Sequence, residues 1–258
     1  MFTLRKAVIA GIDSDIGSAL AKRWMKKGVE VLGTSLGKSD YVRCDLSDAV
    51  SVDKAAEKLQ KTGKGWEILV MCPGSLEPIG KFSDNDINEW ERSVLINFVR
   101  QMRLVHGLLP VRAKTTATGP TVLWFAGGGV NNAPINYSAY TVSKIALIKM
   151  AELLDAEMND VCFTVIGPGW VKTKIHKETL RAGERAGDNL QRTKEMLSGG
   201  EMTPINKVLD CIDWVARSPR EEVGGRNISA ACDDWGSDRL NRVLAEDRNM
   251  YKLRRYGN

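Results

Sequence analysis

The chain has 258 residues, of which 43% are hydrophobic and 27% are charged, and its formal net charge is +5 at pH 7. These values are typical of a globular protein and exclude a disordered, collagen-like or coiled-coil chain. No apolar run approaches the roughly 18 residues that a membrane span needs, and the first residues lack the pattern of a signal peptide. We therefore expect a soluble, cytoplasmic protein with no membrane partner.

Cysteine and histidine give no sign of a metal site or of a disulfide framework. The five cysteines are scattered and never spaced as CxxC, and the two histidines, His106 and His176, lie far apart in the sequence. This usage suits a reducing compartment. The modest positive charge contains no block of five or six like charges and no nucleic-acid motif, so we expect no nucleic-acid partner.

Short apolar runs alternate with amphipathic stretches along much of the chain. Runs typical of buried strands span 6–11, 29–33, 67–71, 120–125 and 161–166, and helical patterns span 16–27, 49–61, 87–109 and 140–158. Strands that alternate with helices predict a parallel sheet with helices on both faces. We expect an α/β fold, doubly wound, that forms a single domain over 1–258 and binds ligands at the carboxyl ends of its strands.

Two further segments do not follow this alternation. The segment 172–203 is polar and glycine-containing, which is typical either of a mobile lid or of a solvated pair of surface helices. Its basic residues are consistent with an anionic substrate, but a solvated helix face is the favoured interpretation. They are Lys172, Lys174, Lys177, Arg181 and Arg185. The segment 236–258 forms a C-terminal extension.

The turn after the first predicted strand has the spacing of a phosphate-binding loop. Gly11 permits a tight turn, Gly17 permits close packing of the helix on the strand, and the helix start near Ile16 can present backbone N–H groups to a pyrophosphate. Asp13 and Asp15 place carboxylates where an anion would lie. Ser14 or Asp15 can instead be the N-cap of the helix.

Several motifs appear together in one order. They are Cys44-Asp-Leu-Ser-Asp48, Ile96-Asn97, Tyr140-Thr-Val-Ser-Lys144 and Gly167-Pro-Gly-Trp-Val-Lys-Thr173. In these motifs the chain resembles the short-chain dehydrogenase/reductase family, over about residues 5–235. The resemblance implies a Rossmann-type NAD(P)-binding domain and an oxidoreductase that acts on a carbonyl or an alcohol.

The resemblance also implies roles for individual residues. Tyr140 would be the catalytic acid/base, Lys144 would lower the tyrosine pKa and bind ribose hydroxyls, and Asn97 would hold a water that relays protons. Tyr140 and Lys144 are four residues apart, so both lie on one face of a helix. The other residues that would contact the cofactor are Asp45, Leu46, Pro73, Gly74, Pro168, Gly169, Val171 and Thr173.

Three positions depart from the family pattern. The family places a catalytic serine 13 residues before its tyrosine, and here that position is Gly127. Asn131, Asn132 or backbone N–H groups can replace the missing donor, or the glycines make room for a bulky substrate. Asp15 stands at the family's second glycine, and Met71-Cys-Pro-Gly74 replaces its Asn-Asn-Ala-Gly.

The cofactor is predicted from the end of the second strand. The segment Gly33-Thr-Ser35-Leu-Gly-Lys38 has no acidic residue to accept from a ribose 2′-hydroxyl. Ser35 and Lys38 suit a 2′-phosphate, which favours NADP and leaves NAD possible, because Lys38 can also be a solvated side chain.

Three functions remain open from the sequence. The first is a carbonyl reductase or alcohol dehydrogenase, which can act on a nucleotide-activated or other anionic sugar in bacterial polysaccharide synthesis. The second, motivated by Gly127 and Asp15, is a protein of this fold that binds a ligand or partner without redox turnover. The third is a non-redox epimerase or dehydratase. The resemblance implies a homodimer or homotetramer in each case.

Overall fold

The computed structural model describes residues 4–37, 40–114 and 118–255. Seven strands form one parallel sheet in the order β3-β2-β1-β4-β5-β6-β7. Their bounds are β1 Lys6–Ala10, β2 Glu30–Ser35, β3 Val42–Arg43, β4 Ile68–Met71, β5 Thr121–Phe125, β6 Cys162–Gly167 and β7 Asn227–Ser229. The strand order reverses beside β1, which confirms the predicted doubly wound sheet.

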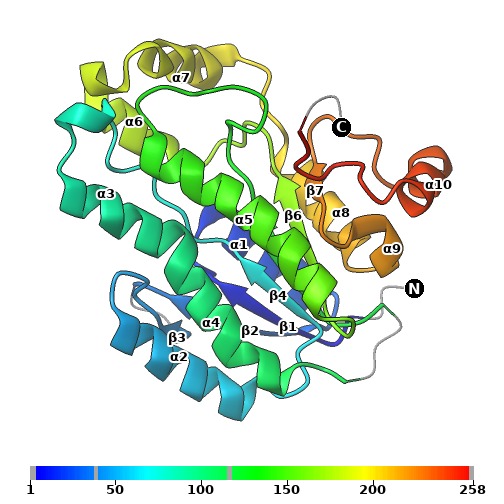
Figure 1. Ribbon diagram of the computed structural model, residues 1–258. Helices are drawn as coiled ribbons and strands as arrows, with labels where there is room; N and C mark the ends of the chain where they lie inside the picture. The colour runs from blue at the N-terminus through cyan, green and yellow to red at the C-terminus, as the bar shows by residue number, and fades with distance from the viewer. Residues whose placement is uncertain (1–3, 38–39, 115–117, 256–258) are drawn as a thin grey trace.

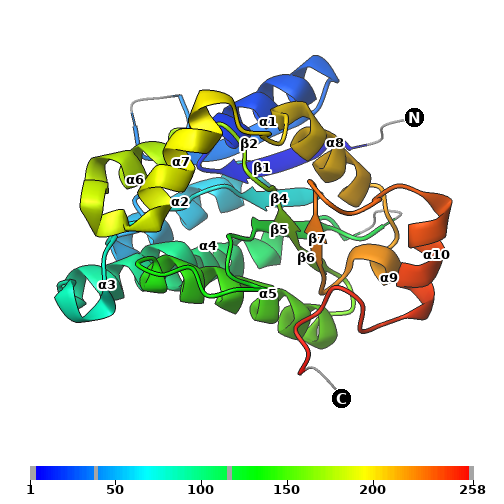
Figure 2. The same ribbon diagram turned by 90° about the horizontal axis from the view of Figure 1, so that it is seen from above.

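Helices cover both faces of the sheet (Figures 1 and 2). One face carries α1 (Asp15–Lys26) and α8 (Ile205–Val215), and the other carries α2 (Ala49–Thr62), α4 (Arg100–Leu108) and α5 (Ser138–Glu157). Side chains alternate along each strand, so Ala7 and Ile9 of β1 belong to the core under α1 while Val8 and Ala10 belong to the core under α4 and α5.

The predicted long helix over 87–109 is interrupted in the middle. The structure divides it into α3 (Ile87–Val94), a π-helical turn (Leu95–Val99) and α4. Such turns insert one extra residue and are frequent at functional sites. This one contains Asn97, which the motif analysis singled out.

The polar segment 172–203 holds α6 (His176–Ala182) and α7 (Asp188–Gly199), joined by a 3₁₀ turn. We call 172–203 the lid segment. It has a small core of its own with Ile79 and Tyr137, which also contains Ala182 and Ala186 of the lid segment. The segment is therefore packed against the loops that follow β4 and β5.

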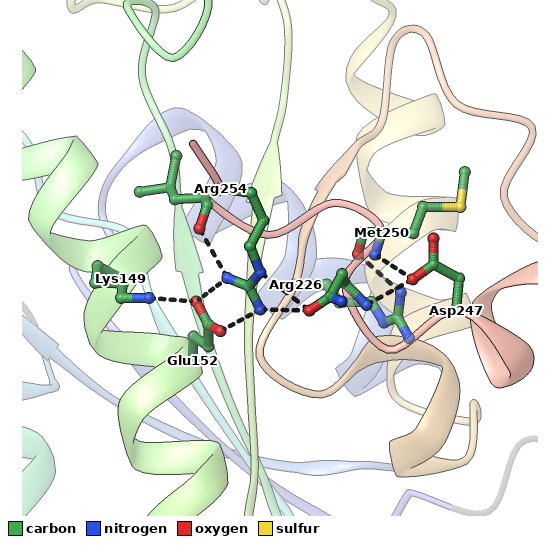
Figure 3. A network of polar contacts seen from close by, with 8 residues as sticks. Lys149, Glu152, Arg226, Asp247, Met250 and Arg254 are labelled. Atoms are coloured by element: carbon green, nitrogen blue, oxygen red, sulfur yellow. Dashed lines mark hydrogen bonds and ion pairs between the residues drawn. The ribbon is translucent and has the colours of Figure 1, made fainter. Parts of the chain in front are cut away.

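The C-terminal extension contains α10 (Asp238–Glu246) and lies beside the short α9 (Arg220–Val223). The guanidinium of Arg226 is buried and donates to the backbone oxygens of Met250 (2.8 Å) and Leu244. Arg254 forms an ion pair with Glu152 of α5 at 2.7 Å (Figure 3). Leu240 and Leu244 of α10 also belong to the buried core on the side of α1 and α8, so apolar packing and these polar contacts together attach the extension.

Sequence patterns missed the short elements. The strands β3 and β7 have two and three residues, which is too few for a period to show. Among the described residues, no helix is long and apolar enough to cross a membrane.

Candidate functional site

The turn between β1 and α1 is shaped by its two glycines. Gly11 has φ +67°, and a Cβ there would lie 3.0 Å from Cγ of Pro73. A Cβ at Gly17 would lie 2.6 Å from the Gly11 oxygen. Ser14 caps α1, because its Oγ accepts from the Gly17 N–H at 3.1 Å, and Asp15 is the first helical residue. The structure thus shows the tight turn at Gly11 and the close packing of α1 on β1 at Gly17 that the sequence predicts.

The two carboxylates of this turn are held by protein groups. Oδ2 of Asp15 accepts from the backbone N–H of Lys174 at 2.6 Å, and Nζ of Lys174 donates to the backbone oxygen of Asp13 at 3.0 Å. Oδ2 of Asp13 accepts from the hydroxyl of Ser35 at 2.6 Å. Asp15 therefore connects the start of the lid segment to the β1–α1 turn.

Asn97 is fully buried, and its amide fixes the loop after β4. Nδ2 donates to the backbone oxygen of Ser75 (2.9 Å) and to Oγ of Ser93 (3.1 Å), while Oδ1 accepts from the Ser75 N–H at 3.0 Å. Both amide hydrogens are used inside the protein. The side chain therefore positions the loop that carries Pro73 and Gly74.

Tyr140 and Lys144 lie one turn apart on α5, and Nζ of Lys144 is 5.6 Å from the centre of the Tyr140 ring. Lys144 is 4% exposed and forms no ion pair with any described carboxylate. A Cβ added at Gly74 would lie 3.6 Å from Nζ and 3.7 Å from Oδ1 of Asn97. The three predicted side chains thus converge on the loop after β4.

Burial shifts the pKa values of both Lys144 and Tyr140. Burial lowers the pKa of Lys144 to about 8. Burial and the carboxylate of Glu178 raise the pKa of Tyr140 to about 12. In this arrangement burial and the negative charge of Glu178 are the causes of the shift, and the lowering of the tyrosine pKa by the ammonium stays a prediction.

Gly127 is packed directly against the tyrosine. A Cβ at Gly127 would lie 2.6 Å from Cε1 and 2.8 Å from the hydroxyl oxygen of Tyr140. A serine does not fit there with Tyr140 in this position. The ring fills the space of the missing side chain, so Gly127 does not make room for a bulky substrate.

Glu178 of α6 is a site residue that the sequence analysis missed. Its Oε2 accepts from the Leu76 N–H at 2.6 Å and from the Ser75 hydroxyl at 3.1 Å. Next to it, the hydroxyls of Tyr137 and Thr179 are hydrogen-bonded at 2.8 Å. These contacts hold the lid segment over the loop that Asn97 positions. In the sequence, Glu178 is one acidic residue in a polar stretch, and no spacing distinguishes it.

The remaining predicted cofactor residues surround the same edge of the sheet. Gly169 has φ +73°, Val171 is buried in the core, and the backbone oxygen of Thr173 accepts from the His176 N–H at 3.4 Å. Oδ1 of Asp45 accepts from both donors of Ser47, which lowers the pKa of this carboxyl. Leu46 is buried, Pro168 is partly exposed, and Lys38 lies outside the described residues.

This edge fits a nicotinamide dinucleotide. The turn at Gly11 and Gly17 brings the N-terminus of α1 close to β1, as an anion site requires, and the Asp15 carboxylate is directed to Lys174. The buried ammonium of Lys144 has no carboxylate partner among the described residues. It can therefore donate hydrogen bonds to the hydroxyl oxygens of a ribose.

Comparisons with known proteins agree with this geometry. The family model "short chain dehydrogenase" matches residues 5–183. A benzil reductase of Saccharomyces cerevisiae is 31% identical over 185 residues, which cover 68% of each chain. An NADPH-dependent 3-dehydrocapnine reductase of Ornithobacterium rhinotracheale is 25% identical over 98% of this chain and 92% of its own length.

A solved structure extends the likeness to the fold. A short-chain dehydrogenase/reductase from Saccharomyces cerevisiae superposes with a TM-score of 0.75 at 19% identity, over 92% of this chain and 98% of that one. The family model, which matches more than half of the chain, and the shared fold lead to one assignment. This chain belongs to the short-chain dehydrogenase/reductase family and is an oxidoreductase that binds NAD or NADP.

Proposed function

We propose that this protein interconverts a carbonyl compound and an alcohol, with Tyr140 as the acid/base. The observation that carries the proposal is the convergence of Tyr140 and Lys144 beside the loop that Asn97 positions. Lys144 is buried and has no carboxylate partner in the part of the chain that the structure describes. The bound cofactor supplies or accepts the hydride. Tyr140 supplies the proton to the carbonyl oxygen in reduction and removes it from the hydroxyl in oxidation.

The raised pKa of Tyr140 favours the reductive direction. A phenol with a pKa of about 12 is protonated in neutral solution and is ready to donate. Lys144, with a pKa of about 8, is mostly an ammonium under the same conditions. Gly127 has no hydroxyl that could donate to the substrate oxygen. The hydroxyl of Tyr140 would therefore bind this oxygen without the serine that the family usually provides.

NADP is the cofactor that the sequence favours, on the grounds of Ser35 and Lys38. The name of the NADPH-dependent relative supports this choice. The contact between Ser35 and Asp13 opposes it, because it places a carboxylate at the end of β2.

The substrate is proposed to be a small carbonyl compound. An anionic sugar has limited support from the lid segment, because Lys174 and Arg185 are already bonded to backbone oxygens of Asp13 and Ile79. The benzil reductase relative is named for a neutral diketone. A screen therefore begins with neutral diketones and continues with nucleotide-activated sugars.

We propose a homodimer or homotetramer in a reducing, cytoplasmic setting. Val99, Val142 and Leu153, on the π-helical turn and on α5, are 39%, 47% and 45% exposed and offer an apolar surface to a second copy. All five cysteines are free thiols, which fits a reducing compartment.

The proposal is tested by removing the hydroxyl of Tyr140 and, separately, that of Tyr137. Tyr140→Phe should abolish turnover, by at least about a thousandfold, and leave the cofactor affinity nearly unchanged. Tyr137→Phe is the matched control, because it removes a hydroxyl that is bonded to Thr179, and it should retain turnover within a few-fold. Equal activity of Tyr140→Phe and the wild type would remove Tyr140 from the mechanism.

Two other functions share this site. The absence of a side chain at Gly127 and the carboxylate of Asp15 in the β1–α1 turn motivate, as a second candidate, a protein of this family that binds its ligand without redox turnover. Cofactor binding without hydride transfer across the substrate screen would identify it. Product formation with no net change in cofactor absorbance would identify an epimerase or dehydratase.

A further inference from the structure

Asp13 brings a carboxylate to the end of β2 from a different loop. Asp13 belongs to the β1–α1 turn, and its Oδ2 accepts from the hydroxyl of Ser35, the last residue of β2, at 2.6 Å. The same hydroxyl oxygen accepts from the Gly37 N–H at 3.0 Å. Ser35 is 1% exposed. Its one hydroxyl hydrogen points to Asp13 and cannot also be donated to a phosphate.

The end of the second strand is the place where dinucleotide folds distinguish their cofactors. An acidic side chain there accepts from the adenosine ribose 2′-hydroxyl of NAD, while a cation there accommodates the 2′-phosphate of NADP. The sequence has no acidic residue on this strand end before Asp40. In the folded chain, the carboxylate of Asp13 takes that place.

We propose that Asp13 is a specificity-determining residue, which accepts a hydrogen bond from the ribose 2′-hydroxyl and disfavours a 2′-phosphate. The inference rests on the proposed use of a nicotinamide dinucleotide. Asp13 is exposed and forms no ion pair with any described cation, since Lys174 contacts its backbone oxygen rather than its carboxylate. Its carboxylate therefore has no ionic partner among residues 4–37, 40–114 and 118–255.

One described cation lies near enough to oppose this effect. Nη1 of Arg43 donates to the Leu36 oxygen at 3.2 Å, one residue beyond Ser35, and the side chain is exposed. The preference of the wild-type protein reflects the balance of Asp13 against Arg43 and against Lys38, which lies outside the described residues. The contribution of Asp13 alone appears as the change in preference when its charge is removed.

The experiment measures the dissociation constants of NADH and NADPH by ligand fluorescence for the wild type and for Asp13→Asn. The asparagine retains an oxygen that can accept from Ser35 and loses only the charge. Asp15→Asn is the matched control, because it removes the same charge two residues away, beside the pyrophosphate that both cofactors share. Thermal unfolding of each variant checks that the fold is retained.

We expect Asp13→Asn to strengthen NADPH binding relative to NADH by about tenfold, since a like charge is removed from the vicinity of the 2′-phosphate. Asp15→Asn should change both affinities by the same factor and leave their ratio within about twofold. Binding of both cofactors with an unchanged ratio in Asp13→Asn overturns the role of Asp13 and leaves the proposed function intact. Failure of the wild type to bind either cofactor overturns both.

Discussion

The lid segment and the C-terminal extension both lie outside the sheet, and they are attached in different ways. The lid segment is held by separate contacts to the loops around the site, such as Glu178 with Leu76 and Lys174 with Asp15. The extension is held by apolar packing of Leu240 and Leu244, by the buried guanidinium of Arg226 and by the ion pair of Arg254 with Glu152 (Figure 3). Figure 2 shows the helices of the lid segment, α6 and α7, at the left of the view and α10 of the extension at the right.

Because the two segments are attached through different residues, their contributions to function and to stability can be tested separately. Contacts of the lid segment involve residues that surround Tyr140, so changing them should alter ionisation and binding at the site. Contacts of the extension involve backbone oxygens distant from Tyr140, so changing them should alter the free energy of unfolding. The following three variants test this separation, starting with the largest expected effect.

Arg226→Met should cause the largest loss of stability. The side chain donates to the backbone oxygens of Met250, Leu244 and Glu221, and methionine leaves all three without this donor. We expect the free energy of unfolding to fall by about 3 kcal/mol in chemical denaturation. Cofactor affinity should not change.

Arg217→Met is the control for Arg226, because it is an exposed arginine that donates to a single backbone oxygen, that of Asp213. Its loss should cost at most about 0.5 kcal/mol. Equal losses for the two variants would contradict the structural role of Arg226, and a weakened cofactor affinity in Arg226→Met would contradict the separation.

Glu178→Gln should act on the site with little effect on global stability. Glutamine can still accept from the Leu76 N–H, but it removes the negative charge that raises the pKa of Tyr140. The tyrosine pKa should fall, so the alkaline limb of the kcat/KM profile for reduction should move to lower pH, by about one unit or less.

Glu184→Gln is the control for Glu178, since Glu184 is an exposed acid of the lid segment and does not contribute to the raised pKa of Tyr140. Its profile should match that of the wild type. A profile that is also unchanged in Glu178→Gln would show that its carboxylate has no electrostatic influence on the reacting hydroxyl.

Arg254→Met should have the smallest effect, visible mainly as a changed pH dependence of stability. Burial opposes ionisation of Glu152, but hydrogen bonds from Arg254 and Lys149 lower its pKa from 4.5 to about 2. A lowered carboxyl pKa stabilises the fold above pH 4.5, and this contribution is lost as the pH falls from 4.5 towards 2. The arginine side chain is 38% exposed, so solvent screening limits the contribution to at most about 1 kcal/mol.

The check is the free energy of unfolding at neutral pH and near pH 3 for the wild type and Arg254→Met. The difference between the two proteins should shrink at the lower pH, where more of the carboxyl is protonated. A difference that is the same at both values would show that Arg254 acts by packing and not by its charge.

Much of the fold could be predicted from local patterns, and the exceptions have physical reasons. Long apolar runs and amphipathic stretches correctly indicated the five longer strands and the helices from α1 to α5, but they missed α8 and α10. The short β3 and β7 follow from pairing with neighbours in the sheet, which a sequence period does not show. The π-helical turn at Asn97 follows from tertiary packing, because the pattern over 87–109 is that of an uninterrupted helix.

For the site, spacing along one helix was sufficient for Tyr140 and Lys144, and the order of motifs indicated the edge of the sheet where Asn97, Gly11 and Gly169 lie. The direction of the tyrosine pKa could not be obtained this way. It depends on burial and on Glu178, which is far from Tyr140 in sequence and lies near it only after the lid segment has packed.

The sequence by itself determined the alternation of strands and helices, the turn at Gly11 and Gly17, and the residue types available for acid/base chemistry, because each depends on a few neighbouring residues. Tertiary structure alone decided that Tyr140 fills the space at Gly127, that the charge of Glu178 acts on Tyr140, and that Asp13 reaches Ser35. Each of these contacts joins segments more than ten residues apart, so its geometry and its electrostatic effect exist only once the chain has folded.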